Sequence, residues 1–177
     1  TYKVRLNVNG KDEEQSFEII PNPNSESTAA DMKAQYEFIS DVNETVDKAH
    51  KSIKNIRAIN KQLKDFQEQY KDDERTKELR EKAKKLEEAL YQTKNRSGQD
   101  PLNFPIKLTN KLGHLNSLVG MGDFAPTEQD KAVKRELEQQ INAELVKFDN
   151  LVSQEISEFN TQFNNLKLNY LLVEDKE

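Results

Sequence analysis

The stretch ISDVNETVDKAHKSIKNIRAINKQL, residues 39–63, carries the apolar ladder that decides the fold. Its apolar residues follow one another in alternating steps of three and four, and Asn60 fills the one gap in the series. Residues at this spacing lie on one stripe of an α-helix, and such a stripe has to be buried against other helices. The ladder consists of Ile39, Val42, Val46, Ala49, Ile53, Ile56 and Leu63.

The polar residue in the ladder, Asn60, has two interpretations. A buried polar residue in a helix seam sets the register of packing. Alternatively, the seam opens to water at this point, where an asparagine costs nothing. The sequence does not decide between the two.

The composition favours long, solvent-exposed helices. Charged residues make up 33% and hydrophobic residues 34% of the 177, whereas only 5 Gly and 5 Pro are present to interrupt helices. The absence of Cys excludes disulfides, thiol catalysis and cysteine-based zinc sites. No apolar stretch approaches the ~20 residues that span a bilayer, so we expect no membrane insertion. The basic cluster at 82–85 is balanced by neighbouring glutamates, which argues against a nucleic-acid partner.

Residues 1–20 are predicted to form a β-hairpin that closes a preceding β domain. Asn9-Gly10 is the dipeptide that best tolerates the positive φ of a two-residue turn. A lone hairpin is marginal in water. This one therefore either packs on the helices or is the last hairpin of a sheet whose other strands lie elsewhere, and we favour the second interpretation. Its predicted apolar face comprises Tyr2, Val4, Leu6, Val8, Phe17 and Ile19.

Because the chain begins at Thr1 inside a strand pattern, we expect it to be a piece of a longer polypeptide. A proline linker at 21–26 should separate the hairpin from a helical bundle over 27–177.

Four helical segments are predicted within the bundle. The first begins at Ser27 or Thr28, with Asp31 in its first turn, and runs to about Lys71. The second follows the acidic turn at 72–74 and runs to about Arg96. The third spans 108–119, and the fourth begins at Thr127 with Asp130 as capping partner and continues to about 166. The apolar stripe of the fourth includes Val152 and Leu166, and the apolar tail 168–173 breaks its period.

The lengths of these helices constrain the architecture. We expect an elongated antiparallel bundle of three long helices, in which the second and third segments run in the same direction as one broken middle helix. Four uneven helices are the alternative. We also expect the long first and last helices to pair antiparallel, because the first half of the bundle is mildly basic and the last part is acidic.

The sequence contains no catalytic, cofactor-binding or metal-binding motif. His50 and His114 have no second histidine at ligand spacing, and the carboxylates follow solvated helix faces. The candidate functional residues instead form a rigid corner between helices, where two X-Pro bonds flank an aromatic ring. They are Asp100, Pro101, Phe104 and Pro105, together with Phe124 in the next loop.

Two roles are open for the aromatic residues of this corner. The Phe104 ring is expected to enter the groove between the first and fourth helices as a plug over the break. The alternative is that Phe104 and Phe124 stay exposed as an anchor for β domains of the same chain or for another partner.

The corner also carries a family resemblance. Segments 99–112 and 122–127, and the ladder before them, resemble the helical C-terminal region of bacterial proteins with a sortilin-type β-propeller, which are described as predicted glycosyl hydrolases. The resemblance extends from about Val4 to Phe159. It implies an exported parent protein whose propeller and a short β region precede the helices. Any glycosidase chemistry would then belong to the propeller, and no catalytic residue carries over to these positions.

The sequence therefore predicts a non-catalytic, C-terminal structural or interaction module without a cofactor. Its expected partners are preceding β domains of the same parent chain. The alternative is an oligomerisation module that forms a homo-oligomer through the first heptad stripe. Glycoside hydrolysis by these residues themselves is the least favoured hypothesis, because the chain has no Trp to serve as a sugar platform.

Overall fold

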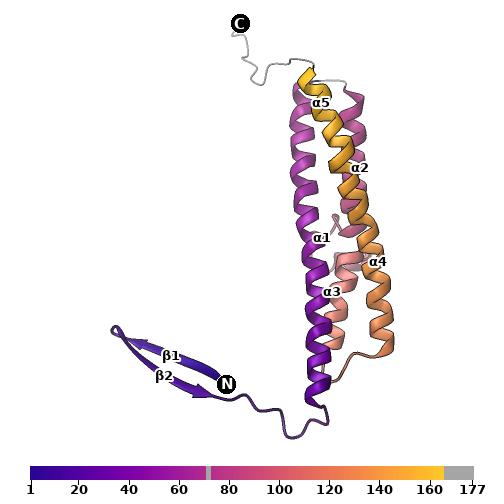
Figure 1. The fold of residues 1–177 in the computed structure, drawn as a ribbon. Coiled ribbons are helices and arrows are strands. Elements are labelled where there is room, and N and C mark those ends of the chain that lie inside the picture. The colour runs from indigo at the N-terminus through magenta and orange to yellow at the C-terminus, as the bar shows by residue number, and fades with distance from the viewer. Residues whose placement is uncertain (71–72, 166–177) are drawn as a thin grey trace.

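The computed structural model describes residues 1–70 and 73–165 and contains a hairpin and a helical rod (Figure 1). The hairpin consists of β1 (Tyr2–Val8) and β2 (Lys11–Phe17). The helices of the rod are α1 (Ala29–Gln69), α2 (Glu74–Leu90), α3 (Leu108–Val119), α4 (Glu128–Asn150) and α5 (Ser157–Asn165). A 3₁₀ turn, η1 (Asp100–Leu102), lies between α2 and α3, and a π-helical segment, η2 (Leu151–Ile156), joins α4 to α5.

The rod is the predicted bundle with a broken middle helix. Both α2 and α3 run antiparallel to α1, one after the other along the rod (Figure 1). Two contacts establish this direction: Arg57 of α1 pairs with Glu87 of α2 at 2.6 Å, and Gln35 near the start of α1 donates to the Val119 carbonyl at the end of α3 at 2.8 Å. The prediction of a mainly helical bundle with an N-terminal hairpin is confirmed.

The expected antiparallel pairing of the two long helices is wrong, because α1 and α4 run parallel. Lys134 near the start of α4 forms an ion pair with Asp41 near the start of α1. At the other end of the rod, the Phe66 ring of α1 lies 5.2 Å from the Phe159 ring of α5. The broken middle helix, α2 and α3, brings the chain back to the end of the rod where α1 begins. The last helical stretch, from α4 to α5, therefore runs in the same direction as α1.

Side-chain caps set the starts of α1 and α4, as predicted. Thr28 accepts from the Asp31 backbone N–H at 3.2 Å, and the Asp31 carboxylate accepts from the Thr28 backbone N–H at 2.8 Å. Thr127 and Asp130 form the same reciprocal pair at the start of α4. The Thr28 hydroxyl donates to the Asp31 carboxylate at 2.6 Å. This bond and the one from the Thr28 backbone N–H lower the pKa of Asp31, because they favour its ionised form.

The second helix ends earlier than the sequence predicts, at Leu90 and not near Arg96. Leu90 is the last apolar residue of its stripe and is fully buried. Its carbonyl accepts a hydrogen bond of 2.9 Å from the Thr109 hydroxyl, which lies in the first turn of α3. A carbonyl satisfied from outside the helix no longer needs a further turn.

The last rod is also less regular than the predicted single helix. Its π-helical segment changes the phase of the apolar stripe, so Leu151 is buried whereas Val152, predicted to be in the stripe, is 40% exposed. The predicted stripe residue Leu166 and the apolar tail 168–173 lie outside the described residues.

The core is continuous along the rod and contains most of the ladder. Val42, Ala49, Ile53, Ile56 and Leu63 are buried, and Ile39 and Val46 pack against them half-buried. Asn60 is half-buried at a groove that it shares with Gln67 of α1 and Arg80 of α2, so its surroundings are polar and the seam is open there. The other buried apolar residues are Phe38, Leu79, Ala83, Leu86, Leu90, Leu112, Leu115, Leu137, Ile141, Phe148 and Leu151.

A pair of adjacent substitutions tests the seam. Ile53 is 3% exposed, and Ile53→Asp should destabilise the bundle by more than about 3 kcal/mol because it buries an unpaired charge. Lys54→Asp, on the exposed side of the same turn, should change stability by less than about 1 kcal/mol. Urea unfolding followed by circular dichroism measures both, and equal sensitivity at the two positions would contradict the seam assignment.

Candidate functional site

Four of the five candidate residues lie in the corner, which is the loop of residues 91–107 between α2 and α3. Two hydrogen bonds close its base. The Thr109 hydroxyl donates to the Leu90 carbonyl, and the Gln92 side-chain amide donates to the Pro105 carbonyl at 2.7 Å. Thr109 and Gln92 are 2% and 8% exposed, so these bonds are shielded from water. The ends of the loop are therefore held together while its tip projects from the rod.

Asp100 organises the tip of the loop. Its carboxylate accepts from the Arg96 backbone N–H at 2.5 Å, from the Ser97 backbone N–H at 2.9 Å and from the Ser97 hydroxyl at 2.7 Å. These bonds favour the ionised form and lower the pKa of Asp100, with the bond from Arg96 as the largest cause. Pro101 follows in the first turn of η1, where its fixed φ suits the start of a helical turn. Asp100 is thus a structural carboxylate whose oxygens accept their hydrogen bonds from the neighbouring residues Arg96 and Ser97.

Phe104 is not the plug that the sequence predicts. Its ring is half-buried, 5.8 Å from the Lys94 ammonium, and it lines a cleft of about 710 Å³ beside the ends of α2 and α3 and Gln140 of α4. The ring does not join the core cluster. The buried residues at the break are instead Leu90, Thr109 and Leu112, and the Thr109 hydroxyl joins the start of α3 to the end of α2.

Phe124 lies apart from the other candidate residues. It follows the end of α3, whereas the corner precedes its start, so 12 helical residues, roughly 18 Å of helix, separate them. Its ring is 65% exposed and lies over Gly122, where an added Cβ would approach ring carbon Cδ2 to 3.1 Å. The structure therefore does not assemble Phe104 and Phe124 into one anchor.

The described residues offer no cluster that could hold a metal ion. Among them, no group of three or more His, Asp or Glu side chains is placed to hold a metal ion. His50 is exposed and meets the Tyr91 ring edge-on at 6.3 Å, and His114 is exposed on α3. Within the same residues, no helix is long and apolar enough to cross a membrane.

The hairpin presents an exposed apolar face, although the sequence analysis did not name its residues as a candidate site. Asn9 and Gly10 both have positive φ, 51° and 81°, as a tight two-residue turn of the predicted kind requires. Tyr2 stands opposite Phe17 in the register, and their rings stack at 5.8 Å. Between 46% and 61% of each apolar side chain on this face is exposed, namely Tyr2, Val4, Leu6, Val8 and Phe17.

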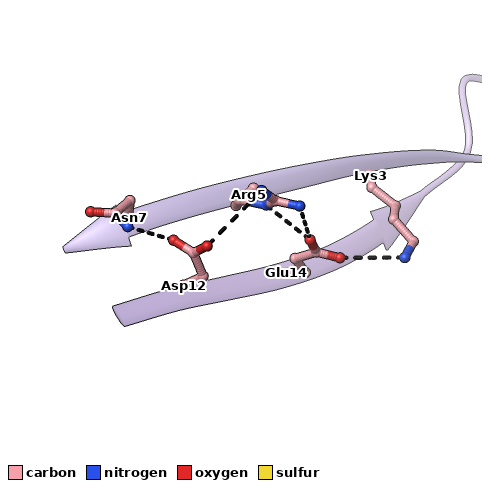
Figure 2. A network of polar contacts seen from close by, with 5 residues as sticks. All are labelled: Lys3, Arg5, Asn7, Asp12 and Glu14. Carbon is pink, nitrogen blue, oxygen red and sulfur yellow. Dashed lines mark hydrogen bonds and ion pairs between the residues drawn. The ribbon is translucent and has the colours of Figure 1, made fainter. Parts of the chain in front are cut away.

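The opposite face of the hairpin is polar and self-sufficient (Figure 2). Arg5 pairs with Glu14 at 2.7 Å and with Asp12 at 4.0 Å, and Lys3 pairs with Glu14 at 3.3 Å. The Asn7 amide donates to Asp12 at 2.5 Å. Two basic and two acidic side chains thus neutralise one another, so this face is suited to water.

Neither strand contacts any helix of the described chain, and Figure 1 shows the hairpin standing apart from the rod. The hairpin therefore exposes an apolar face that the bundle does not cover. No protein-family model, curated protein or solved structure matches this chain.

Two truncations distinguish a surface role of Phe104 from a core role. Phe104→Ala should lower the free energy of unfolding by less than about 1.5 kcal/mol, because the ring is only half-buried. Leu112→Ala should cost about 2–5 kcal/mol, since Leu112 is fully buried below the break. Chemical denaturation provides both values, and a larger loss at Phe104 than at Leu112 would restore the plug.

The charge of Asp100 gives the corner a pH dependence. Because hydrogen bonds depress the folded-state pKa of Asp100, its contribution to stability is present above the unfolded pKa and is lost as the pH falls through the folded one. Asp100→Ala should therefore melt at a lower temperature than the parent chain at pH 7, and the difference should shrink towards about pH 2. Thermal melts at both pH values measure this. A difference that does not depend on pH would exclude the carboxylate as its cause.

Proposed function

We propose that this chain is a non-catalytic structural and interaction module, in which the helical rod is a brace and the hairpin is the element that docks on a β domain. The observation that carries the proposal is the exposed apolar face of a hairpin that contacts no helix. A two-stranded hairpin is marginally stable by itself and needs an apolar cover. The rod does not supply that cover, so the partner has to.

The self-contained core of the rod supports this division of labour. Its buried cluster extends from Phe38 near one end to Phe148 and Leu151 in the last rod, without any residue of the hairpin. The bundle can therefore fold and remain rigid whether or not the hairpin is docked. A rigid rod attached through the proline-containing segment 21–26 holds its far end at a set distance from the docked domain.

The burial of the heptad stripe weighs against an oligomerisation module. Val42, Ala49, Ile53 and Ile56 are at most 3% exposed within one chain, so they have no apolar area left for a second copy. Pairing through this stripe would require the bundle to open. The proposal therefore places the interaction surface on the hairpin.

The resemblance to sortilin-type propeller proteins extends the proposal to the parent chain. We propose that the docked domain is a β domain that precedes the hairpin in an exported bacterial protein. Any glycoside hydrolysis would then reside in the propeller of that protein and not in these residues. What supports this part is the resemblance at 99–112 and 122–127.

Removal of the hairpin tests whether the rod is independent of it. Deletion of residues 1–20 should leave the helical circular dichroism signal and the cooperativity of melting nearly unchanged, because neither strand contacts a helix. Urea unfolding of the truncated and intact chains gives the comparison. A loss of more than about 3 kcal/mol would mean that the hairpin belongs to the bundle core.

A further inference from the structure

We infer that β1 is an interior strand and β2 the edge strand of a larger sheet, completed by a β-strand that adds to the free edge of β1. The added strand comes from a β domain in the same polypeptide. The inference rests on the proposed function and specifies it: it states which edge of the hairpin is joined and which stays exposed. The order of strands in the completed sheet is then partner, β1, β2.

The apolar face of the hairpin is asymmetric across its two strands. On this face β1 contributes Tyr2, Val4, Leu6 and Val8, all of them apolar. The residues of β2 that stand opposite are Phe17, Gln15, Glu13 and Lys11, of which only Phe17 is apolar. The apolar stripe therefore follows β1 along its whole length. A cover for this stripe has to be centred on β1 and to extend beyond its free edge.

The two edges of the hairpin differ in charge as well. From the turn onward, β2 carries four consecutive charged residues, Lys11 to Glu14. Charged side chains on an outer strand are a common device against further strand pairing. In β1, charged residues occur only at alternate positions and are already neutralised by β2 (Figure 2). Only β1 therefore has an edge that is compatible with another strand.

The register identifies the backbone groups that the added strand would use. A two-residue turn of this type closes with Val8 and Lys11 as a hydrogen-bonded pair, and such pairs alternate along an antiparallel ladder. The backbone groups of Lys3, Arg5 and Asn7 therefore point to the free edge of β1. Those of Asp12, Glu14 and Ser16 point to the free edge of β2. The two sets stand opposite one another in the ladder and form a built-in comparison.

The size of the apolar face indicates that the partner is tethered. Five side chains, each about half exposed, offer on the order of 500 Å² of apolar surface. A stable interface between separate molecules buries about 800 Å² per partner, polar surface included, and joins parts that are stable by themselves. A two-stranded hairpin is marginal by itself, so a second copy docked on the hairpin alone would be held weakly. A domain in the same polypeptide benefits from a millimolar effective concentration and needs less area. The occupant is therefore a strand of that polypeptide, with the apolar cover of its sheet.

Residue-resolved amide hydrogen exchange tests the strand order. The experiment compares the 177-residue chain with the longer parent polypeptide that the proposed function assigns to it. In the full-length protein the amides of Lys3, Arg5 and Asn7 should exchange slower by on the order of 100-fold or more, because they become paired. The amides of Asp12, Glu14 and Ser16 should exchange rapidly in both proteins.

Proline substitution at one cross-strand pair provides a matched control. Arg5→Pro removes an N–H that the added strand needs. Glu14→Pro removes the N–H of the residue directly opposite, which points to the free edge of β2, and both variants lose the same ion pair. Only Arg5→Pro should abolish the protection of the remaining β1 amides in the full-length protein. Leu6→Thr should weaken the same protection without the loss of an N–H, whereas Glu13→Thr, directly opposite, should not.

The possible outcomes separate this inference from the proposed function. Protection of Asp12, Glu14 and Ser16 in place of the β1 set would overturn the strand order but leave a docked hairpin. Protection of neither set would overturn the strand order. If the amides of Tyr2, Val4 and Leu6, which pair with β2, also exchanged no slower than in the 177-residue chain, the docking would be overturned as well. Sedimentation of the 177-residue chain should show a monomer. Self-association that Arg5→Pro abolishes would identify a second copy as the occupant and would overturn the tethered partner.

Discussion

The long apolar stripe of α1 is the constraint on which the rest of the bundle depends. A helix of 41 residues is roughly 60 Å long, and its stripe has to be covered over nearly that whole length. α2 and α3, with 17 and 12 residues, are each too short to do so, but they cover it when placed end to end. The direction of the last rod, and its parallel arrangement with α1, follow from this solution.

The junction between α2 and α3 shows how two short helices act as one. The carboxyl end of α2 faces the amino end of α3, so the helix dipoles align head to tail, and the Thr109 hydroxyl links the two helices through the Leu90 carbonyl. The connecting residues 91–107 are left outside this line and form a loop of their own. The loop is ordered locally, by Asp100 at its tip and by the bond from Gln92 to the Pro105 carbonyl at its base. The loop therefore has a fixed shape, and its half-buried Tyr91 packs against the core.

The rod and the hairpin differ in how far their apolar faces are covered. In the rod the stripes are buried, and its exposed helix faces carry many ion pairs, such as those of Lys48 with Glu44 and Lys51 with Asp47. In the hairpin only one face is satisfied, because its charges neutralise one another there while Tyr2, Val4 and Leu6 remain exposed on the other. An apolar face on a marginal element, attached to a stable one, is what an interaction module requires. For this reason we place the proposed interaction surface on the hairpin and not in the clefts of the rod.

Local patterns determined much of this protein without tertiary information. The ladder at 39–63, the capping pairs Thr28–Asp31 and Thr127–Asp130, and the turn at Asn9-Gly10 depend on residues close in the sequence, and each was predicted correctly. The end of α2 at Leu90, the outward position of Phe104 and the parallel course of α1 and α4 were predicted wrongly. Each of these depends on a residue or element beyond the local sequence: Thr109 for Leu90, Gln140 of the shared cleft for Phe104, and the returning middle helix for α4. Local spacing specifies which face of an element is apolar. Only the packed structure decides which element covers that face, because the burial of a side chain depends on all the helices that pack around it.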